Sequence, residues 1–236
     1  MVKTGYAQLC KILNAIANWK HFWWVTFAGC TVPAVLLFFK IGAISFMPSW
    51  GPLVNDTIGG LGVDPLKSLL HETGEDSLGI LLASLAITPI RRLFKVNGIQ
   101  KVRRMVGVWS FAYAVVHVSL YLGLDQLCYS LETCDFRAIG NDLLKRKFIF
   151  MGMISFTILT ALAITSTNGM IRRLKKRWQP LHRLVYVAGI SAVIHFIWVQ
   201  KSDYAEPLMW AGWLAAFLLI RVYLSVQKRR AKAAHA

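Results

Sequence analysis

Two histidines stand in one strongly apolar stretch of the chain, residues 181–198, which reads LHRLVYVAGISAVIHFIW. They are His182 and His195, thirteen positions apart. A third histidine, His117, lies in a second apolar stretch, FAYAVVHVSLY. An ionisable side chain within hydrocarbon is costly, so intramembrane histidines are expected to serve a function. Metal or haem ligation and proton transfer are the chemistries open to imidazoles in such a setting.

His117 and His195 are predicted to lie at a similar depth in two different helices. His117 is twelve residues beyond Met105, the predicted inner start of its helix, or about 18 Å at 1.5 Å per residue. His195 is about as far from His182, at the inner start of the other helix. Two imidazoles at matched depth suit the two axial positions of a low-spin haem. We therefore predict that His117 and His195 ligate a haem iron in the outer half of a bilayer.

The role of His182 stays open at this point. Pro180 favours the first turn of a helix, which places His182 at the inner interface. Along an ideal helix, thirteen residues turn His182 and His195 toward different faces. The other helix offers Arg103 and Arg104 at the matching inner depth, not a histidine. A second haem with His182 as ligand, a flavin contact and an interfacial histidine are all compatible with this pattern.

The remaining histidines have weaker signals. His71 opens the segment HETGEDS, just outside the predicted second span. It can replace a haem ligand, hydrogen-bond a haem propionate or a quinol, or cap the helix. His21 stands beside a lysine at the inner start of the first span, where an interfacial role is expected. His235 lies in the basic tail, and no role is predicted for it.

The elements that must position these histidines are apolar segments of membrane-spanning length. Of the 236 residues, 56% are hydrophobic and 16% are charged, whereas soluble domains carry about a quarter charged residues. A membrane span needs roughly 20 residues of helix. We predict an all-α chain with one domain over residues 1–236, a six-helix transmembrane bundle. The predicted spans are 22–41, 77–94, 105–124, 148–165, 184–199 and 208–226.

The charged residues predict the orientation of these spans. Of the 27 lysines and arginines, 20 fall on the side of the N-terminus, whereas all 11 acids fall on the other side. Because an excess of Lys and Arg marks the cytoplasmic side, both termini are predicted to be cytoplasmic. Anionic lipid headgroups, not nucleic acid, are the expected partner of the net charge of +16. Residues 1–21 lack the features of a cleavable signal peptide, so the first span is expected to remain as an anchor.

Several motifs are absent from the sequence. We detect no internal repeat, no glycine-rich phosphate loop leading into a helix and no zinc-type spacing of Cys or His. A standard soluble domain for a nicotinamide or FAD is therefore excluded, and electrons would have to come from a lipid-soluble donor or a separate protein. Cys128 and Cys134 share the second outer loop, where a disulfide and two free thiols are both compatible with the sequence.

Four segments together resemble the MsrQ family, formerly YedZ. They are DPLKSLLHETG (64–74), LLASLAITPIRRL (81–93), RRMVGVWSFAYAVVHVSLY (103–121) and ALAITSTNGMIRRLKKRWQPLHRLVYVAGISAVIHFIW (161–198). The resemblance extends over roughly residues 20–225. The family comprises haem-binding membrane subunits of the bacterial periplasmic methionine sulfoxide reductase system. It belongs to a wider ferric-reductase-like group of transmembrane haem proteins.

The resemblance implies a haem b electron-transport subunit of the bacterial inner membrane. It would take electrons from quinol and pass them to a periplasmic molybdenum-containing partner that reduces oxidised methionine in proteins. The chain would then be a non-catalytic subunit, with one or two haems and FMN as its cofactors. The haem histidines of the family carry over to His117, His182 and His195. Because the third span holds a single histidine, the resemblance does not imply a second bis-histidine haem.

Two other functions compete with this one. The first is a stand-alone transmembrane ferric reductase acting at the outer face; acidic outer loops attract cations, but no clustered metal ligands occur there. The second is a haem-free transporter that relays protons through its histidines. Such a transporter is expected to carry carboxylates within its spans, and the spans 22–41, 105–124 and 184–199 contain none.

Overall fold

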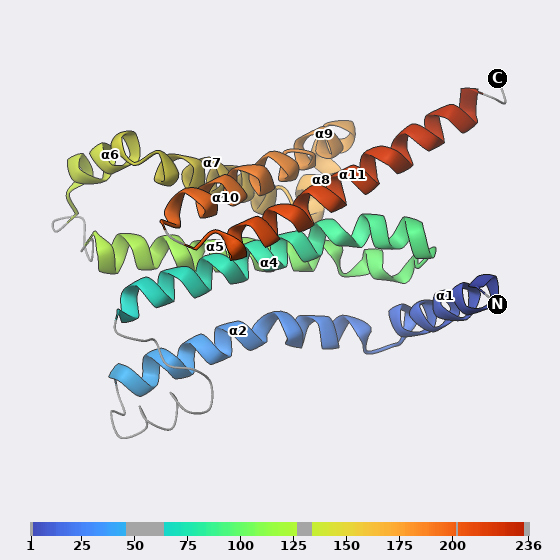
Figure 1. Cartoon of the computed structure of the whole chain (residues 1–236), viewed down its shortest axis with the longest axis horizontal. Helices are drawn as coiled ribbons and strands as arrows, with labels where there is room; N and C mark the ends of the chain where they lie inside the picture. The colour runs from blue at the N-terminus through green and yellow to red at the C-terminus, as the bar shows by residue number, and fades with distance from the viewer. Residues whose placement is uncertain (1, 46–63, 127–133, 202, 234–236) are drawn as a thin grey trace.

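The computed structural model describes residues 2–45, 64–126, 134–201 and 203–233. Within these ranges every regular element is a helix and no strand occurs, so the predicted all-α class is confirmed. The long helices lie side by side as a bundle (Figure 1). The predictions for Cys128 and His235 fall outside the described residues. Cys134 is disulfide-bonded.

In chain order, the α-helices are α1 (Val2–Asn18), α2 (Phe22–Ser45), α4 (Pro65–Phe94), α5 (Arg103–Leu120), α6 (Phe136–Lys145), α7 (Lys147–Ile164), α8 (Asn168–Leu174), α9 (Trp178–His182), α10 (Val185–Val199) and α11 (Ala205–Ala233). Short helical turns are η2 (Gly98–Lys101), η3 (Tyr121–Asp125) and η4 (Lys175–Arg177).

Among the described residues, five helices are long and apolar enough to cross a membrane: α2, α4, α5 with its extension, α7 and α11. The helix α10 is short, but it forms a sixth candidate together with residues 168–182, from which it is bent by 43°. The chain is therefore a multi-pass membrane protein, and six spans result when the bent pair counts as one.

The helix α4 begins earlier than the predicted span that starts at Ser77. It starts at Pro65, a residue type suited to a first helical turn, and Asp64 caps it by accepting a hydrogen bond from the Lys67 N–H at 3.1 Å. His71 consequently lies inside the helix, and its interpretation as a helix cap is wrong. The polar segment HETGEDS, expected just outside the second span, is part of α4.

Two helix pairs form the centre of the bundle, because α4 packs most extensively against α5 and α7 against α10. In the first pair, Ser77 donates to the Ser110 carbonyl at 3.0 Å and Ser110 donates to the Ser77 carbonyl at 2.9 Å. In the second, Ser155 donates to the Ala188 carbonyl at 2.9 Å. Small hydroxyl residues let membrane helices approach closely and bond to each other.

The helix α2 is joined to the first pair by a side chain of α5. Pro33 interrupts the backbone hydrogen bonds of α2. The Tyr113 hydroxyl enters this break, where it accepts from the Ala34 N–H at 2.8 Å and donates to the Cys30 carbonyl at 2.7 Å. Both backbone groups are thereby satisfied without water, as the hydrocarbon region requires.

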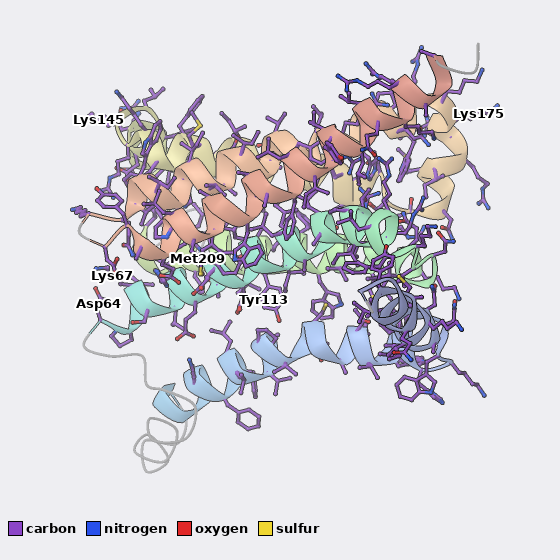
Figure 2. The ribbon with its side chains drawn as sticks, turned by 45° about the vertical axis from the view of Figure 1, so that its right-hand side comes forward. Asp64, Lys67, Tyr113, Lys145, Lys175 and Met209 are labelled. Carbon is purple, nitrogen blue, oxygen red and sulfur yellow. The ribbon has the colours of Figure 1, made fainter. Side chains whose placement is uncertain are left out.

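The two ends of the bundle differ in their elements and charge. The helices α1, α8 and α9 and the last turns of α11 lie at one end, and α6 and the start of α4 lie at the other (Figure 1). Accordingly, Lys175 lies opposite to Asp64, Lys67 and Lys145 (Figure 2). The first of these ends, called the basic end below, carries the arginine-rich segments 91–104 and 172–183.

Candidate functional site

The structure brings together two of the histidines singled out from the sequence. The rings of His117 on α5 and His195 on α10 lie with their centroids 6.3 Å apart and their planes at 87°. Each comes from a different helix pair, so the two imidazoles meet where the pairs face each other. The two residues thus lie beside each other on separate helices, and haem ligation by them stays a prediction.

The Nδ1 atoms of both rings contact backbone carbonyls. His117 Nδ1 lies 2.9 Å from the Leu70 oxygen, and His195 Nδ1 lies 2.6 Å from the Phe148 oxygen. A carbonyl only accepts, so each Nδ1 carries the hydrogen and each Nε2 keeps its lone pair. In the described part of the chain neither Nε2 has a hydrogen-bond partner. This tautomer, held by a carbonyl, is the usual state of a metal-ligating histidine.

Two glycines make room for the rings. A Cβ at Gly74 of α4 would lie 3.1 Å from His117 Cε1, and a Cβ at Gly152 of α7 would lie 2.9 Å from His195 Nδ1. A contact under 3.0 Å is sterically forbidden, so Gly152 in particular cannot carry a side chain with the ring in this place. The glycines let α4 and α7 approach the two imidazoles closely.

The two halves of this arrangement repeat each other in sequence register. Each histidine bonds to a carbonyl 47 residues before it. Each interhelix serine bonds to a carbonyl 33 residues after it. The two glycines stand at the same offset from their histidines as well. The structure therefore corrects the conclusion that the chain has no internal repeat. The pairs α4–α5 and α7–α10 each carry a half-site, meaning one histidine with its carbonyl, glycine and serine contacts at the same sequence spacings.

The distance between the two ring centroids is compatible with one metal ion between two imidazoles. A first-row metal bonds an imidazole nitrogen at about 2.0–2.1 Å, which separates the ring centroids of two opposed ligands by about 6 Å. The observed 6.3 Å agrees with this separation. Neutral imidazoles with free Nε2 atoms are also the donors that a low-spin haem takes.

His71 is placed with carboxylates. Its Nε2 lies 3.5 Å from Glu206 of α11, and its Nδ1 lies 4.0 Å from Glu75 one turn further along α4. Its ring packs against Phe196, the neighbour of His195 in sequence, at 5.5 Å between centroids. Among the described residues, no group of three or more His, Cys, Asp and Glu is arranged to hold a metal ion.

His182 has contacts of a different kind. Its Nε2 lies 3.1 Å from the Thr165 hydroxyl, which itself donates to the Ala161 carbonyl at 2.7 Å. Because that hydroxyl has one hydrogen, His182 Nε2 must donate to it. The ring also stacks on Trp178, with centroids 4.0 Å apart. His182 closes α9, and the chain then bends by 43° into α10, so His182 and His195 do not stand on one ideal helix.

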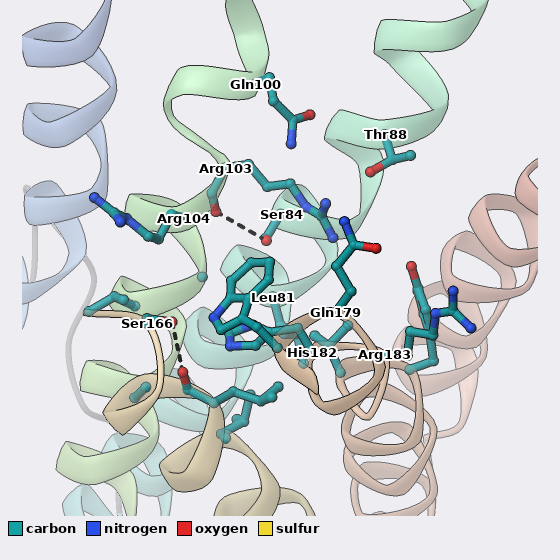
Figure 3. A pocket seen from close by; sticks show the side chains of 18 of the residues that line it. Leu81, Ser84, Thr88, Gln100, Arg103, Arg104, Ser166, Gln179, His182 and Arg183 are labelled. Atoms are coloured by element: carbon teal, nitrogen blue, oxygen red, sulfur yellow. Dashed lines mark hydrogen bonds between the residues drawn. The ribbon is translucent and has the colours of Figure 1, made fainter. Parts of the chain in front are cut away.

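A cavity of about 510 Å³ adjoins His182 at the basic end. It lies among α4, α5, α7 and the bent segment that leads into α10, with Tyr186 and Arg221 contributing from α10 and α11. Side chains of Arg103, Gln179 and His182 come together there (Figure 3). The sequence predicts Arg103 and Arg104 at the depth of His182 but does not reveal the cavity, because its other walls come from residues far apart in the chain.

Comparisons with known proteins identify the family of the chain. The family described as "Ferric reductase like transmembrane component" matches residues 77–193. The Protein-methionine-sulfoxide reductase heme-binding subunit MsrQ of Xanthomonas campestris pv. campestris (strain B100) is 42% identical over 175 residues, or 74% of this chain and 78% of the relative. The protein of that name from Rhodospirillum rubrum is 43% identical over 173 residues, or 73% and 80%. With these similarities over most of both chains, the protein belongs to the MsrQ family.

Proposed function

We propose that this chain is the haem b-binding membrane subunit of a protein-methionine-sulfoxide reductase, and that it transfers electrons to the catalytic subunit. The observation that carries the proposal is the His117–His195 pair, with both Nδ1 atoms bonded to carbonyls and both Nε2 atoms unpartnered in the described part of the chain. The names of the relatives support it. The whole chain would form one ferric-reductase-like haem domain.

The residues around the pair would prepare it for electron transfer. A bound haem supplies a reversible one-electron couple. His117 and His195 would hold its iron from both sides, and the carbonyls of Leu70 and Phe148 would fix the ring orientation and raise the basicity of each Nε2. A site whose ligands do not move between oxidation states favours repeated electron transfer.

The direction of transfer follows from the proposed orientation. The basic end would face the cytoplasm of the bacterial inner membrane, by the bias of Lys and Arg. Quinol would be the electron donor and a periplasmic molybdenum-containing subunit the acceptor, docking on the acidic end. Oxidation of quinol releases protons, and His71 with Glu75 and Glu206 offers bases at that end. FMN is proposed as a further cofactor, and His182 as a residue of an inner cofactor site.

The test is a set of visible spectra of the detergent-purified protein, oxidised and then reduced with dithionite. We expect a low-spin b-type spectrum that is lost in His117→Ala and in His195→Ala. His21→Ala, which changes a histidine at the start of α2, is the matched control and should keep the spectrum. A folded wild-type protein without haem, or a spectrum unchanged in both alanine variants, contradicts the proposal.

A stand-alone ferric reductase is the second candidate, favoured by the description of the matching family. The two functions differ in their acceptor. Reduced protein should pass electrons to ferric chelates only slowly, and to the sulfoxide reductase partner within the time of turnover. Rapid oxidation by ferric chelate, with no response to the partner, would favour the second candidate.

A further inference from the structure

We propose that α1 lies in the surface of the bilayer at the basic end of the bundle and binds anionic phospholipid there. Its exposed apolar side chains would sit at the start of the lipid chains, and its lysines would sit at the headgroups. The inference is independent of the proposed haem site, to which α1 contributes no residue. The helix α1 is not among the described helices that are long and apolar enough to cross a membrane.

One side of α1 packs on the protein. Its residues follow the spacing i, i+3, i+4 and i+7 and are at least partly buried: Cys10, Leu13, Asn14 and Ala17. The Asn14 side-chain amide donates to the Lys95 carbonyl at 3.3 Å. A Cβ at Gly98 would lie 2.6 Å from the Ala17 oxygen, so the two backbones meet directly. These contacts fix α1 to the turn after α4, and the directions of its other sides are thereby set.

A second side of α1 exposes an apolar strip, which consists of Leu9, Ile12 and Ile16. These side chains are 44%, 56% and 50% exposed. Their spacing of i, i+3 and i+7 places them on one face of the helix. The polar residues Lys11 and Asn18, also exposed, belong to the face turned away from this strip. A helix with separate apolar and polar faces is the kind that lies in the plane of a bilayer surface.

The connection to α2 brings the apolar strip close to the point where the chain enters the hydrocarbon region. The candidate span of α2 begins at Phe22, whose N–H bonds to the Trp19 carbonyl at 3.1 Å. Trp19 and Trp24 are both exposed, and tryptophan is enriched at the boundary between lipid and water. In Figure 2, α1 is seen almost along its axis, whereas α2 runs across the view. The chain therefore turns between a surface helix and a spanning helix.

The charges of this region favour anionic lipid over other occupants of the strip. Residues 1–45 contain four lysines and no Asp or Glu. Lys11 and Lys20 are exposed. Basic residues beside a membrane surface are attracted to anionic headgroups. An acidic protein surface would match these lysines, but it would not account for an apolar strip next to the start of a membrane span.

The experiment uses the full chain in lipid nanodiscs, with a nitroxide spin label on one introduced cysteine. The label is placed at Ile12→Cys on the apolar strip or at Lys11→Cys on the polar face, both in a Cys10→Ala, Cys30→Ala background. Oxygen concentrates in lipid and a nickel chelate concentrates in water, so the two collision rates report the surroundings of each label. We expect the ratio of oxygen to nickel collisions to be several-fold larger at position 12 than at position 11.

Nanodiscs with and without phosphatidylglycerol test the class of lipid. Phosphatidylglycerol should lower the nickel collisions of the label at position 12, because it draws the helix toward the bilayer. Lys11→Gln combined with Lys20→Gln should remove this response. Lys145→Gln, on α6 at the opposite end of the bundle, is the control and should keep it (Figure 2). Circular dichroism of every variant distinguishes loss of lipid contact from loss of the fold.

Three results would overturn the proposal. Equal collision ratios at positions 11 and 12 would show that the strip does not lie in lipid. Magnetic coupling between labels at position 12 of two chains would assign the strip to a contact between copies. A label that lies in lipid but does not respond to phosphatidylglycerol would exclude anionic headgroups as the partner of the lysines.

Discussion

At the scale of single residues, the space around the two imidazoles is set by glycine. Gly152 stands against His195 more closely than Gly74 stands against His117. A methyl group at either position must displace a ring or its helix, and the carbonyl contacts that hold Nδ1 would lengthen. Groups that only orient a metal ligand commonly change metal affinity by about 10–100-fold when altered.

Gly152→Ala is therefore expected to lower haem affinity by about 10–100-fold, because the new Cβ would lie only 2.9 Å from His195 Nδ1 and would push the ring aside. The measurement is haem bound per protein after titration of the haem-free chain. Gly212→Ala on α11, where a Cβ meets nothing within 4 Å, is the control and should bind haem as the wild type does. Equal affinities in the two variants would contradict the close packing of α7 against His195.

A second prediction concerns the two ligand positions on either side of the proposed haem iron. If His117 and His195 both bind the iron, as proposed, the dithionite-reduced protein should not change its spectrum under carbon monoxide. His195→Gly should open one position, bind carbon monoxide and lose that ability when free imidazole is added. A carbon monoxide complex in the wild type would show that only one of the two histidines is a ligand.

At the scale of helices, Tyr113 holds α2 to α5 through the break at Pro33. Tyr113→Phe keeps the ring but leaves the Ala34 N–H and the Cys30 carbonyl without this partner. We expect the free energy of unfolding to fall by about 1–3 kcal/mol. Thermal unfolding in detergent, followed by circular dichroism, measures the change. Tyr204→Phe, at an exposed tyrosine before α11, should leave the midpoint unchanged.

Helix boundaries mark the limit of prediction from sequence. Apolar runs predicted the existence of the spans, because lipid-facing residues must be apolar. The apolar runs could not predict the first turns of α4, because these turns contain the polar stretch from His71 to Asp76. Polar residues are tolerated there because the turns pack on other helices. The break between α9 and α10 was likewise hidden inside one apolar run. The repeated half-site escaped detection because its equivalence rests on a few positions, such as Gly74 and Gly152.

At the scale of the whole molecule, the separation of charge between the two ends predicts the orientation. In cells, a membrane-impermeant maleimide should label Leu144→Cys on α6 and should not label Lys175→Cys, both in a Cys10→Ala background. Leu144 is 80% exposed, so access is not limited by packing. After permeabilisation both positions should react. Labelling of Lys175→Cys alone in intact cells would reverse the proposed orientation.

The equal register of α4–α5 and α7–α10 makes the two halves mutually dependent. Each helix pair supplies one imidazole, one carbonyl to orient it and one glycine to admit it, so neither pair alone would supply both histidines of the proposed haem site. A group bound between the rings would contact both copies of the motif, and its binding free energy would add to the stability of the folded bundle. Haem would act as a structural bridge between the halves as well as an electron carrier.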